Sequence, residues 1–349
     1  MKRSPALSLL ALLSLLPCAV RAAAPAEAPP ARYLIRADGK YGYMDRTGSV
    51  TIKPAFEWAS DFSEGRARFR EGGRYGLIDS AGVTIVKPQY EWIGAFREGL
   101  AVARQGEKYG YLDAQGAWAI EPRYDDAYDF HEGKAAVRVG RQWGFVSPKG
   151  LEVLSIKHLQ TADFGGGLGM LLVDQKKGWQ YADERGATLA FEPCYTVSRF
   201  SEGLAFVGKG YGTKLGFIDT AGKVAIEFQF RQAQPFSEGL AAVAPDYYWG
   251  FIDKTGTLVI KDEYAQVDGF SEGLARVKTR DKGWGYVDKT GTLILPPVYA
   301  WAGNFKDGLA RVVQDGAWAY LDKAGNVVWR EAKPPAQEVT PAGAAGVRE

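Results

Sequence analysis

The chain has 349 residues, of which 46% are hydrophobic and 13% aromatic, and its formal net charge at pH 7 is +2. This composition supplies enough apolar material for a large core. Because Lys, Arg, Asp and Glu are interspersed and nearly balanced in number, the charge argues against nucleic acid and against anionic membrane surfaces as partners.

Residues 1–22 have the features of a signal peptide. Lys2 and Arg3 precede an apolar run that ends at Val20, which is too short to span a bilayer stably but has the length of a signal sequence. Small residues favour cleavage after Ala22, which removes three basic residues and changes the net charge from +2 to −1. We therefore expect a periplasmic or secreted protein with no transmembrane segment in the mature chain.

Cys18 raises the question of a lipid anchor. Pro17 stands where lipoprotein signals carry Gly, Ala or Ser, so an anchor at Cys18 is not expected. Without the signal peptide only Cys194 remains, and the mature chain then has no internal disulfide despite an oxidising compartment.

The segments that flank the central region are predicted to lie outside the fold. Residues 23–32 form a linker rich in Ala and Pro, and residues 330–349 form a disordered tail that is poor in aromatic residues.

Residues 33–329 contain nine copies of a repeat of about 34 residues. An aromatic residue followed by Gly marks most copies, at Tyr41-Gly42, Tyr75-Gly76, Tyr109-Gly110, Trp143-Gly144, Trp249-Gly250 and Trp284-Gly285, with altered pairs at Trp179-Gln180, Leu215-Gly216 and Trp318-Ala319. We interpret the pair as a packing device in which the bare glycine admits an aromatic ring from a neighbouring strand. The fourth and fifth copies depart most from the pattern, with a Ser at 147 and a Gly at 166.

Each copy predicts three short antiparallel strands. In the clearest copy these are 274–278, 284–288 and 292–295, all rich in β-branched and aromatic residues. An Asp-x-x-Gly turn joins the second strand to the third, and a connector containing Pro and a Glu-Gly pair leads to the next copy.

The fold class predicted is all-β: three-stranded hairpin units stacked into an elongated, solenoid-like array. Nine intact units leave no orphan strand with which the two chain ends could complete a shared unit, which favours the open array. A closed, β-propeller-like ring is the alternative.

The recurring motif resembles the WG-repeat family, also called KWG repeats. The likeness rests on Trp-Gly-Phe-Ile-Asp at 249–253, the turn at 254–256 and Phe-Ser-Glu-Gly-Leu-Ala at 270–275, and it covers residues 33–329. The resemblance implies an all-β array in a bacterial secreted or envelope protein, acting as an interaction module without an assigned chemistry and without catalytic residues.

The sequence shows no grouping of residues that indicates catalysis, a cofactor or a metal site. His131, His158 and Cys194 have no usable partners at catalytic or zinc-binding spacing. The repeated carboxylates form one series at the Asp turns and another at the connectors, and we interpret both as turn caps because each stands beside a turn glycine. A catalytic pair would need two acids in unlike environments.

One connector position carries the candidate binding residues. Trp58, Trp92 and Trp301 occupy it in three copies, whereas other copies hold polar residues such as Asp126 and Gln232. A position that tolerates polar residues is not deep core, so these tryptophans are candidates for an exposed binding surface. The alternative is that each Trp only covers its own connector.

Three functions follow in order of preference. The first is a non-enzymatic exported scaffold that binds an envelope or extracellular protein or another envelope macromolecule. The second is a carbohydrate- or peptidoglycan-binding module that uses Trp58, Trp92 and Trp301, and the third is a glycoside hydrolase that uses the repeated carboxylates.

Overall fold

The computed structural model describes residues 30–210 and 212–332. The predicted signal peptide, most of the predicted linker and residues 333–349 of the predicted tail lie outside these ranges. Every regular element in the described part is a β-strand, and none of its segments is a helix long and apolar enough to cross a membrane.

The strands of the described residues form nine antiparallel sheets, here called blades one to nine in chain order. Blades one to three are β1 (Tyr33–Ala37), β2 (Lys40–Met44), β3 (Val50–Phe56); β4 (Trp58–Ala59), β5 (Arg66–Glu71), β6 (Arg74–Asp79), β7 (Thr84–Tyr90); and β8 (Trp92–Ile93), β9 (Leu100–Gln105), β10 (Lys108–Asp113), β11 (Trp118–Tyr124). Blades four to six are β12 (Asp126–Ala127), β13 (Ala135–Val139), β14 (Gln142–Val146), β15 (Glu152–His158); β16 (Gln160–Gly165), β17 (Leu168–Asp174), β18 (Gly178–Ala182); and β19 (Thr196–Val197), β20 (Leu204–Gly208), β21 (Leu215–Asp219), β22 (Val224–Phe230). Blades seven to nine are β23 (Gln232–Ala233), β24 (Ala241–Ala244), β25 (Trp249–Ile252), β26 (Leu258–Tyr264); β27 (Gln266–Val267), β28 (Leu274–Lys278), β29 (Trp284–Asp288), β30 (Leu293–Tyr299); and β31 (Trp301–Ala302), β32 (Leu309–Gln314), β33 (Ala317–Asp322), β34 (Val327–Arg330).

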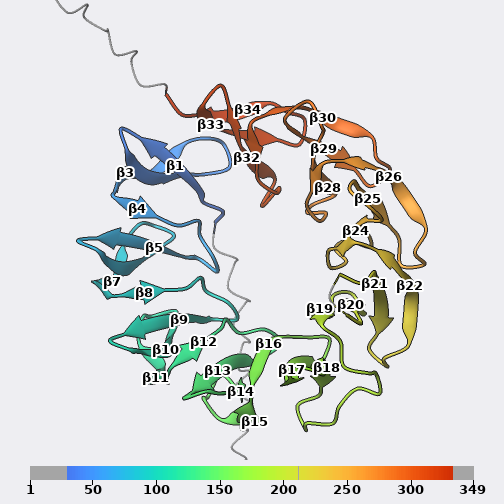
Figure 1. Ribbon diagram of the computed structural model, residues 1–349. Coiled ribbons are helices and arrows are strands. Elements are labelled where there is room, and N and C mark those ends of the chain that lie inside the picture. Colours follow the sequence, from blue (N-terminus) through green and yellow to red (C-terminus); the bar gives the residue numbers. More distant parts are fainter. Residues whose placement is uncertain (1–29, 211, 333–349) are drawn as a thin grey trace, which may run out of the picture.

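The blades stand side by side in a closed ring, with the first next to the last (Figure 1). The fold is therefore a nine-bladed β-propeller, with the short strands innermost and strands such as β22, β26 and β30 on the outside (Figure 1). The prediction of an open, elongated array is wrong, and the closed ring that was the alternative is confirmed.

Among the strands that the structure describes, none of blade one pairs with one of blade nine. Blades one and nine instead pack face to face, burying Tyr33, Ile35, Met44, Leu309 and Tyr320 in one apolar cluster. The absence of an orphan strand in the sequence was therefore no sign of an open array, because side-chain packing joins the ends.

The unit is also larger than predicted, because most blades have four strands. The additional inner strand is only two residues long and arises from the connector, as at Trp58–Ala59. A two-residue strand is too short to show the alternation by which a strand is predicted from sequence.

The recurrent glycine admits the backbone of the next strand, and at Gly76 also the predicted aromatic ring, that of Phe69. At Gly250, a methyl group on the α-carbon would lie 2.5 Å from the carbonyl oxygen of Ile260 in the next strand. The outer strand bulges towards the glycine at this point, as the register shift between Trp249 and Phe251 records. A crossing backbone, rather than an aromatic ring, therefore requires glycine here.

Ala319, which replaces this glycine in blade nine, supports the same explanation. There the outer strand pairs with Ala319 and Tyr320 in continuous register, so no bulge crosses Ala319 and a side chain is tolerated. In blade five, where Gln180 replaces the glycine, an outer segment still pairs with β18, at Trp179–Cys194 and Ala182–Thr188.

The Asp turns and the connector turns form as the sequence indicates. Asp45 accepts hydrogen bonds from the backbone N–H groups of Thr47 at 2.8 Å and Ser49 at 3.1 Å. In the connector, Glu64 and Gly65 both have positive φ angles, 50° and 74°, as a tight two-residue hairpin turn requires. These turns fix where each inner strand begins and ends.

Candidate functional site

The three candidate tryptophans lie on the inner wall of the ring. Trp58, Trp92 and Trp301 are each the first residue of a two-residue inner strand. Trp92 and Trp301 are 38% and 41% exposed, and Trp58 is half-buried. The prediction that this position lies outside the deep core agrees with these exposures, while no finding tests a binding role.

Blade one differs from most of its neighbours because its three described strands include no inner strand beside β1. This difference lies at the seam where the first blade meets the ninth. The complete blades show what an inner strand normally contacts, and therefore what is missing at the seam.

Three contacts recur between an ordinary blade and the inner segment of the next one. The hydroxyl of Tyr286 donates a hydrogen bond to the carbonyl of Gly303, at 2.6 Å. Arg68 donates to the carbonyl of Ile93, the second residue of the next inner strand, at 3.0 Å. Ser63, in the connector turn, donates to the carbonyl of the next connector's phenylalanine, at 2.7 Å.

At the seam, the same three positions of blade nine find other partners. Tyr320 donates to the carbonyl of Leu34 in β1 itself, at 2.9 Å. Arg311 pairs with Asp61 of blade two, Nη1 to Oδ1 at 3.4 Å. Lys306 reaches past blade one to the carbonyl of Phe62, at 2.9 Å. Blade nine thus contacts blade two across the inner edge of blade one.

Tyr33 fills the place that a connector phenylalanine fills in other blades. In blade nine, the buried Phe305 packs edge-on against Tyr286 of the preceding blade, with ring centroids 5.0 Å apart. In blade one, the ring of Tyr33 makes this contact with Tyr320, at 5.5 Å. The residue aligned with Tyr33 is small in other blades, for example Ala67.

Two pockets open beside β1, where residues 30–332 as described provide no inner strand. The first, of about 450 Å³, is lined by residues that include Leu34 and Trp58, and the second, of about 220 Å³, by residues that include Tyr33 and Trp301. The two share three residues, Asp61, Lys306 and Arg311. We call Trp58, Asp61, Arg68, Trp301, Lys306 and Arg311 the seam site.

The seam site is aromatic and mainly basic. The Arg68 guanidinium lies 5.7 Å from the ring of Trp58 and that of Arg311 lies 5.8 Å from Trp301, so each tryptophan has a cation beside it. Burial lowers the pKa of Arg68 from its ordinary value. Such a surface favours ligands that carry negative charge and apolar area together.

Trp92 lies in another pocket, of about 690 Å³, between blades three and four. Its lining includes Tyr128, Asp129 and Asp163. Burial raises the pKa of Asp129, against the lowering effect of Arg97. The structure therefore separates Trp92 from the pair Trp58 and Trp301.

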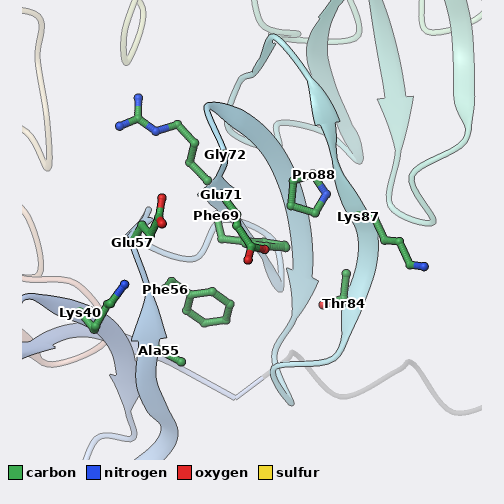
Figure 2. Close-up of a pocket in the computed structure, with 11 residues that line it drawn as sticks. Lys40, Ala55, Phe56, Glu57, Phe69, Glu71, Gly72, Thr84, Lys87 and Pro88 are labelled. Atoms are coloured by element: carbon green, nitrogen blue, oxygen red, sulfur yellow. The ribbon is translucent and has the colours of Figure 1, made fainter.

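A wider pocket of about 750 Å³ lies between blades one and two. Phe56 and Phe69, with ring centroids 5.2 Å apart, are among its lining residues, and Lys40, Glu57 and Lys87 spread around them (Figure 2). Charges of both signs are dispersed there rather than directed at one point, so we do not place the functional site in this pocket.

The residues considered for catalysis lie in different environments. Burial raises the pKa of the Cys194 thiol to about 11, which leaves it a protonated, weak nucleophile. His158 is partly buried in β15, and burial lowers its pKa. His131 lines the pocket of Trp92. Within residues 30–210 and 212–332, no group of three or more His, Cys, Asp or Glu residues is arranged to hold a metal ion.

The connector glutamates bind the backbone of the next blade. The two carboxylate oxygens of Glu64 accept hydrogen bonds from the N–H groups of Glu98 and Gly99, each at 2.8 Å. Glu132 binds Gly166 and Gly167 in the same way. This series links neighbouring blades, and its carboxylates are therefore engaged in architecture.

Sequence reasoning found both tryptophans of the seam site but missed its four charged residues, Asp61, Arg68, Lys306 and Arg311. A signal was present, because Lys306 aligns with serines such as Ser63 and Tyr33 aligns with alanines. These residues can be interpreted as closing contacts only when blades one and nine are known to be adjacent.

Comparison with protein families matches the one described as WG containing repeat to residues 41–75, 75–109, 109–143, 216–244, 249–282 and 284–318, more than half of the chain. A search of curated proteins gives no match. The crystal structure of the eukaryotic initiation factor is similar at 11% identity, with a TM-score of 0.64 over 86% of this chain and 96% of that one. The computationally designed Ika8 protein has 13% identity and a TM-score of 0.47 over 76% and 93%. At such identities the likeness to the initiation factor shows the fold alone.

Proposed function

Because the chain belongs to the family of WG-containing repeat proteins, we propose that it is a non-enzymatic repeat scaffold, exported to the periplasm or secreted, that binds another envelope protein through the seam site. The observation that carries the proposal is the convergence of Trp58, Trp301, Lys306 and Arg311 at the inner edge of blade one, where the described part of the chain forms no fourth strand. Exposed aromatic side chains beside arginine are the residue types enriched where proteins bind one another.

The rest of the ring is consistent with a scaffold. The repeated Asp and Glu residues accept backbone hydrogen bonds in the turns and between blades, for example at Asp45 and Glu64. We therefore do not propose the hydrolase, which would need those carboxylates for chemistry.

Affinity capture from an envelope extract tests the proposal when wild-type protein is compared with matched variants. Trp58→Gln places at the seam the residue that stands at 232 and 266 in other blades, so folding is expected to persist. Val298→Ser, on an exposed valine of the outer strand β30, is the control. We expect one partner to be lost with Trp58→Gln and retained with Val298→Ser; equal capture by all three proteins contradicts the proposal.

A carbohydrate-binding role is the second candidate, and the pocket of Trp92 favours it. An exposed tryptophan beside Tyr128 and three aspartates offers a stacking platform together with acceptors for sugar hydroxyls. The expected result is retention on immobilised peptidoglycan or polysaccharide that Trp92→Gln abolishes. Unchanged retention, or none by the wild-type protein, contradicts this candidate.

A further inference from the structure

We propose that the inner edge of β1 accepts an extended, acidic segment of a partner protein as an added fourth strand of blade one. The inference rests on the proposed function, because it describes how the seam site holds that partner. Addition of a peptide to an open sheet edge is a general mode of recognition in which backbone hydrogen bonds supply affinity and side chains supply specificity.

The complete blades show that the inner edge of β1, where the described residues place no strand, is shaped for a polypeptide. In blade nine, the carbonyls of Arg311 and Val313 accept hydrogen bonds from the inner segment, from the N–H of Gly303 at 2.8 Å and of Ala300 at 2.9 Å. The equivalent residues of β1 are Leu34 and Arg36. Their backbone groups face the same inner edge, where the hydroxyl of Tyr320 reaches Leu34.

The chain's own inner segments indicate which side chains fit the place. Three of them share a small residue followed, two positions later, by aspartate: Ala59-Ser60-Asp61, Ala127-Tyr128-Asp129 and Thr161-Ala162-Asp163. The carbonyl of this small residue would accept a hydrogen bond from Arg311, as the carbonyl of Ile93 at the same position accepts one from Arg68. The partner segment should therefore carry a small residue, any residue and then a carboxylate.

Charge supports an acidic partner. The pocket beside Trp58 is lined by four cationic side chains and one carboxylate, namely Arg68, Arg97, Lys306, Arg311 and Asp61. Arg311 Nη1 lies 3.4 Å from Asp61 Oδ1, and Asp61 is exposed. Arg311 can therefore bind a second carboxylate, supplied by the partner. The excess positive charge of this pocket would therefore attract a peptide carboxylate.

The flank that precedes residue 30 lies outside the described residues. Arg32 and Arg66 are equivalent, since each donates from Nε to a carbonyl 48 residues further on. This alignment puts Ala28 where the other connectors have their phenylalanine, such as Phe62, and Glu27 where Asp61 stands. Tyr33 takes the place of that phenylalanine, and the flank is the competitor that the experiment must distinguish from a partner segment.

Fluorescence anisotropy of a labelled peptide with the sequence of residues 57–61 tests the inference on the full chain. We expect saturable binding that weakens at least tenfold for Arg311→Ala, while Val298→Ser leaves it unchanged. Alanine stands at the equivalent position 136 and at 242, so the Arg311→Ala protein should fold. Methylation of the peptide's backbone nitrogen at the serine should also weaken binding at least tenfold, because that N–H would pair with Leu34.

Each contrary outcome has a distinct meaning. Absence of binding, or equal binding of the methylated peptide, overturns strand addition. Ala26→Pro removes the backbone N–H of the flank at the position that aligns with Ser60. If this variant binds the peptide at least tenfold more tightly, the flank itself occupies the edge, and the proposal of an added partner strand is overturned. If the peptide does not bind but the Trp58→Gln protein no longer captures the partner, the proposed function stands without strand addition. If capture is also unchanged, both fall.

Discussion

The hydroxyl of Tyr320 donates a hydrogen bond to the backbone carbonyl of Leu34 across 286 positions of sequence. In other blades, the carbonyl equivalent to Leu34 accepts from an inner strand, and the tyrosine donates to that strand instead, as Tyr286 does to Gly303. This one contact joins blades one and nine, and it forms where the described residues provide no inner strand.

Tyr320→Phe should lower the free energy of unfolding by about 1 kcal/mol, the usual net worth of one buried hydrogen bond. Phenylalanine is native at the equivalent positions 145, 217 and 251, so packing should persist. Tyr286→Phe is the matched control, with a similar loss in denaturant unfolding. Only Tyr320→Phe should also speed amide exchange in β1; equal exchange in both variants contradicts the closing role of Tyr320.

Lys306→Ser restores the residue type found at 63, 201 and 271 but shortens the side chain that reaches Phe62. Because the carbonyl of Phe62 then loses its partner across the seam, we expect a loss of about 1 kcal/mol in stability. Limited proteolysis should cut first in β1 or β34. Lys289→Ser, which removes only an exposed pair with Glu238, should change little; equal effects of the two variants count against a seam role for Lys306.

Gly250→Ala should destabilise the protein by about 3 kcal/mol, because the new methyl group meets the carbonyl of Ile260 and the backbone must shift. Gly239→Ala is the control, since nothing lies within 4 Å of a methyl group there and only its positive φ of 90° opposes the change. We expect about 1 kcal/mol for the control in denaturant unfolding. A smaller effect at Gly250 than at Gly239 refutes the crossing-backbone explanation.

Acid should weaken the turns. The hydrogen bond from the Thr290 side chain, with those from the Thr290 and Thr292 N–H groups, lowers the pKa of Asp288 below its ordinary 3.8. For Glu238, burial opposes the shift, but hydrogen bonds from Lys289 and from the Gly273 N–H lower its pKa below 4.5. Carboxylates with a lowered folded-state pKa stabilise the fold above their unfolded values and lose that effect as pH falls.

The melting temperature should therefore be steady between about pH 5 and 7 and fall as the pH drops below about 4.5. Thr290→Ala removes the largest contribution at Asp288 and should make the acid-induced fall shallower. A melting temperature that rises on acidification is the result that contradicts this account.

The strands and turns were predictable from sequence because each follows a local rule. Alternation in segments such as 284–288 and the glycine of each Asp turn were sufficient, and the family resemblance is confirmed by the match to six segments. The two-residue inner strands were missed because they pair only after the connector is folded back, as at Trp301–Ala302.

Closure could not be predicted because it depends on the contacts of individual side chains at the seam. Tyr33 in place of alanine and Lys306 in place of serine look like drift until blades one and nine are adjacent. The same applies to the candidate site, since Trp58 and Trp301 lie 243 positions apart and line adjoining pockets only in the closed ring, whereas Trp92 lies in a different pocket.

Residue-resolved hydrogen–deuterium exchange at the inner edge of β1 tests the central claim most directly. If that edge is open, the amide of Arg36 should exchange much faster than that of Val313, its equivalent in blade nine, which pairs with Trp301 of an inner strand. Saturation with the peptide of residues 57–61 should then slow the Arg36 amide. Equally slow exchange of the two amides in the free protein would contradict the account.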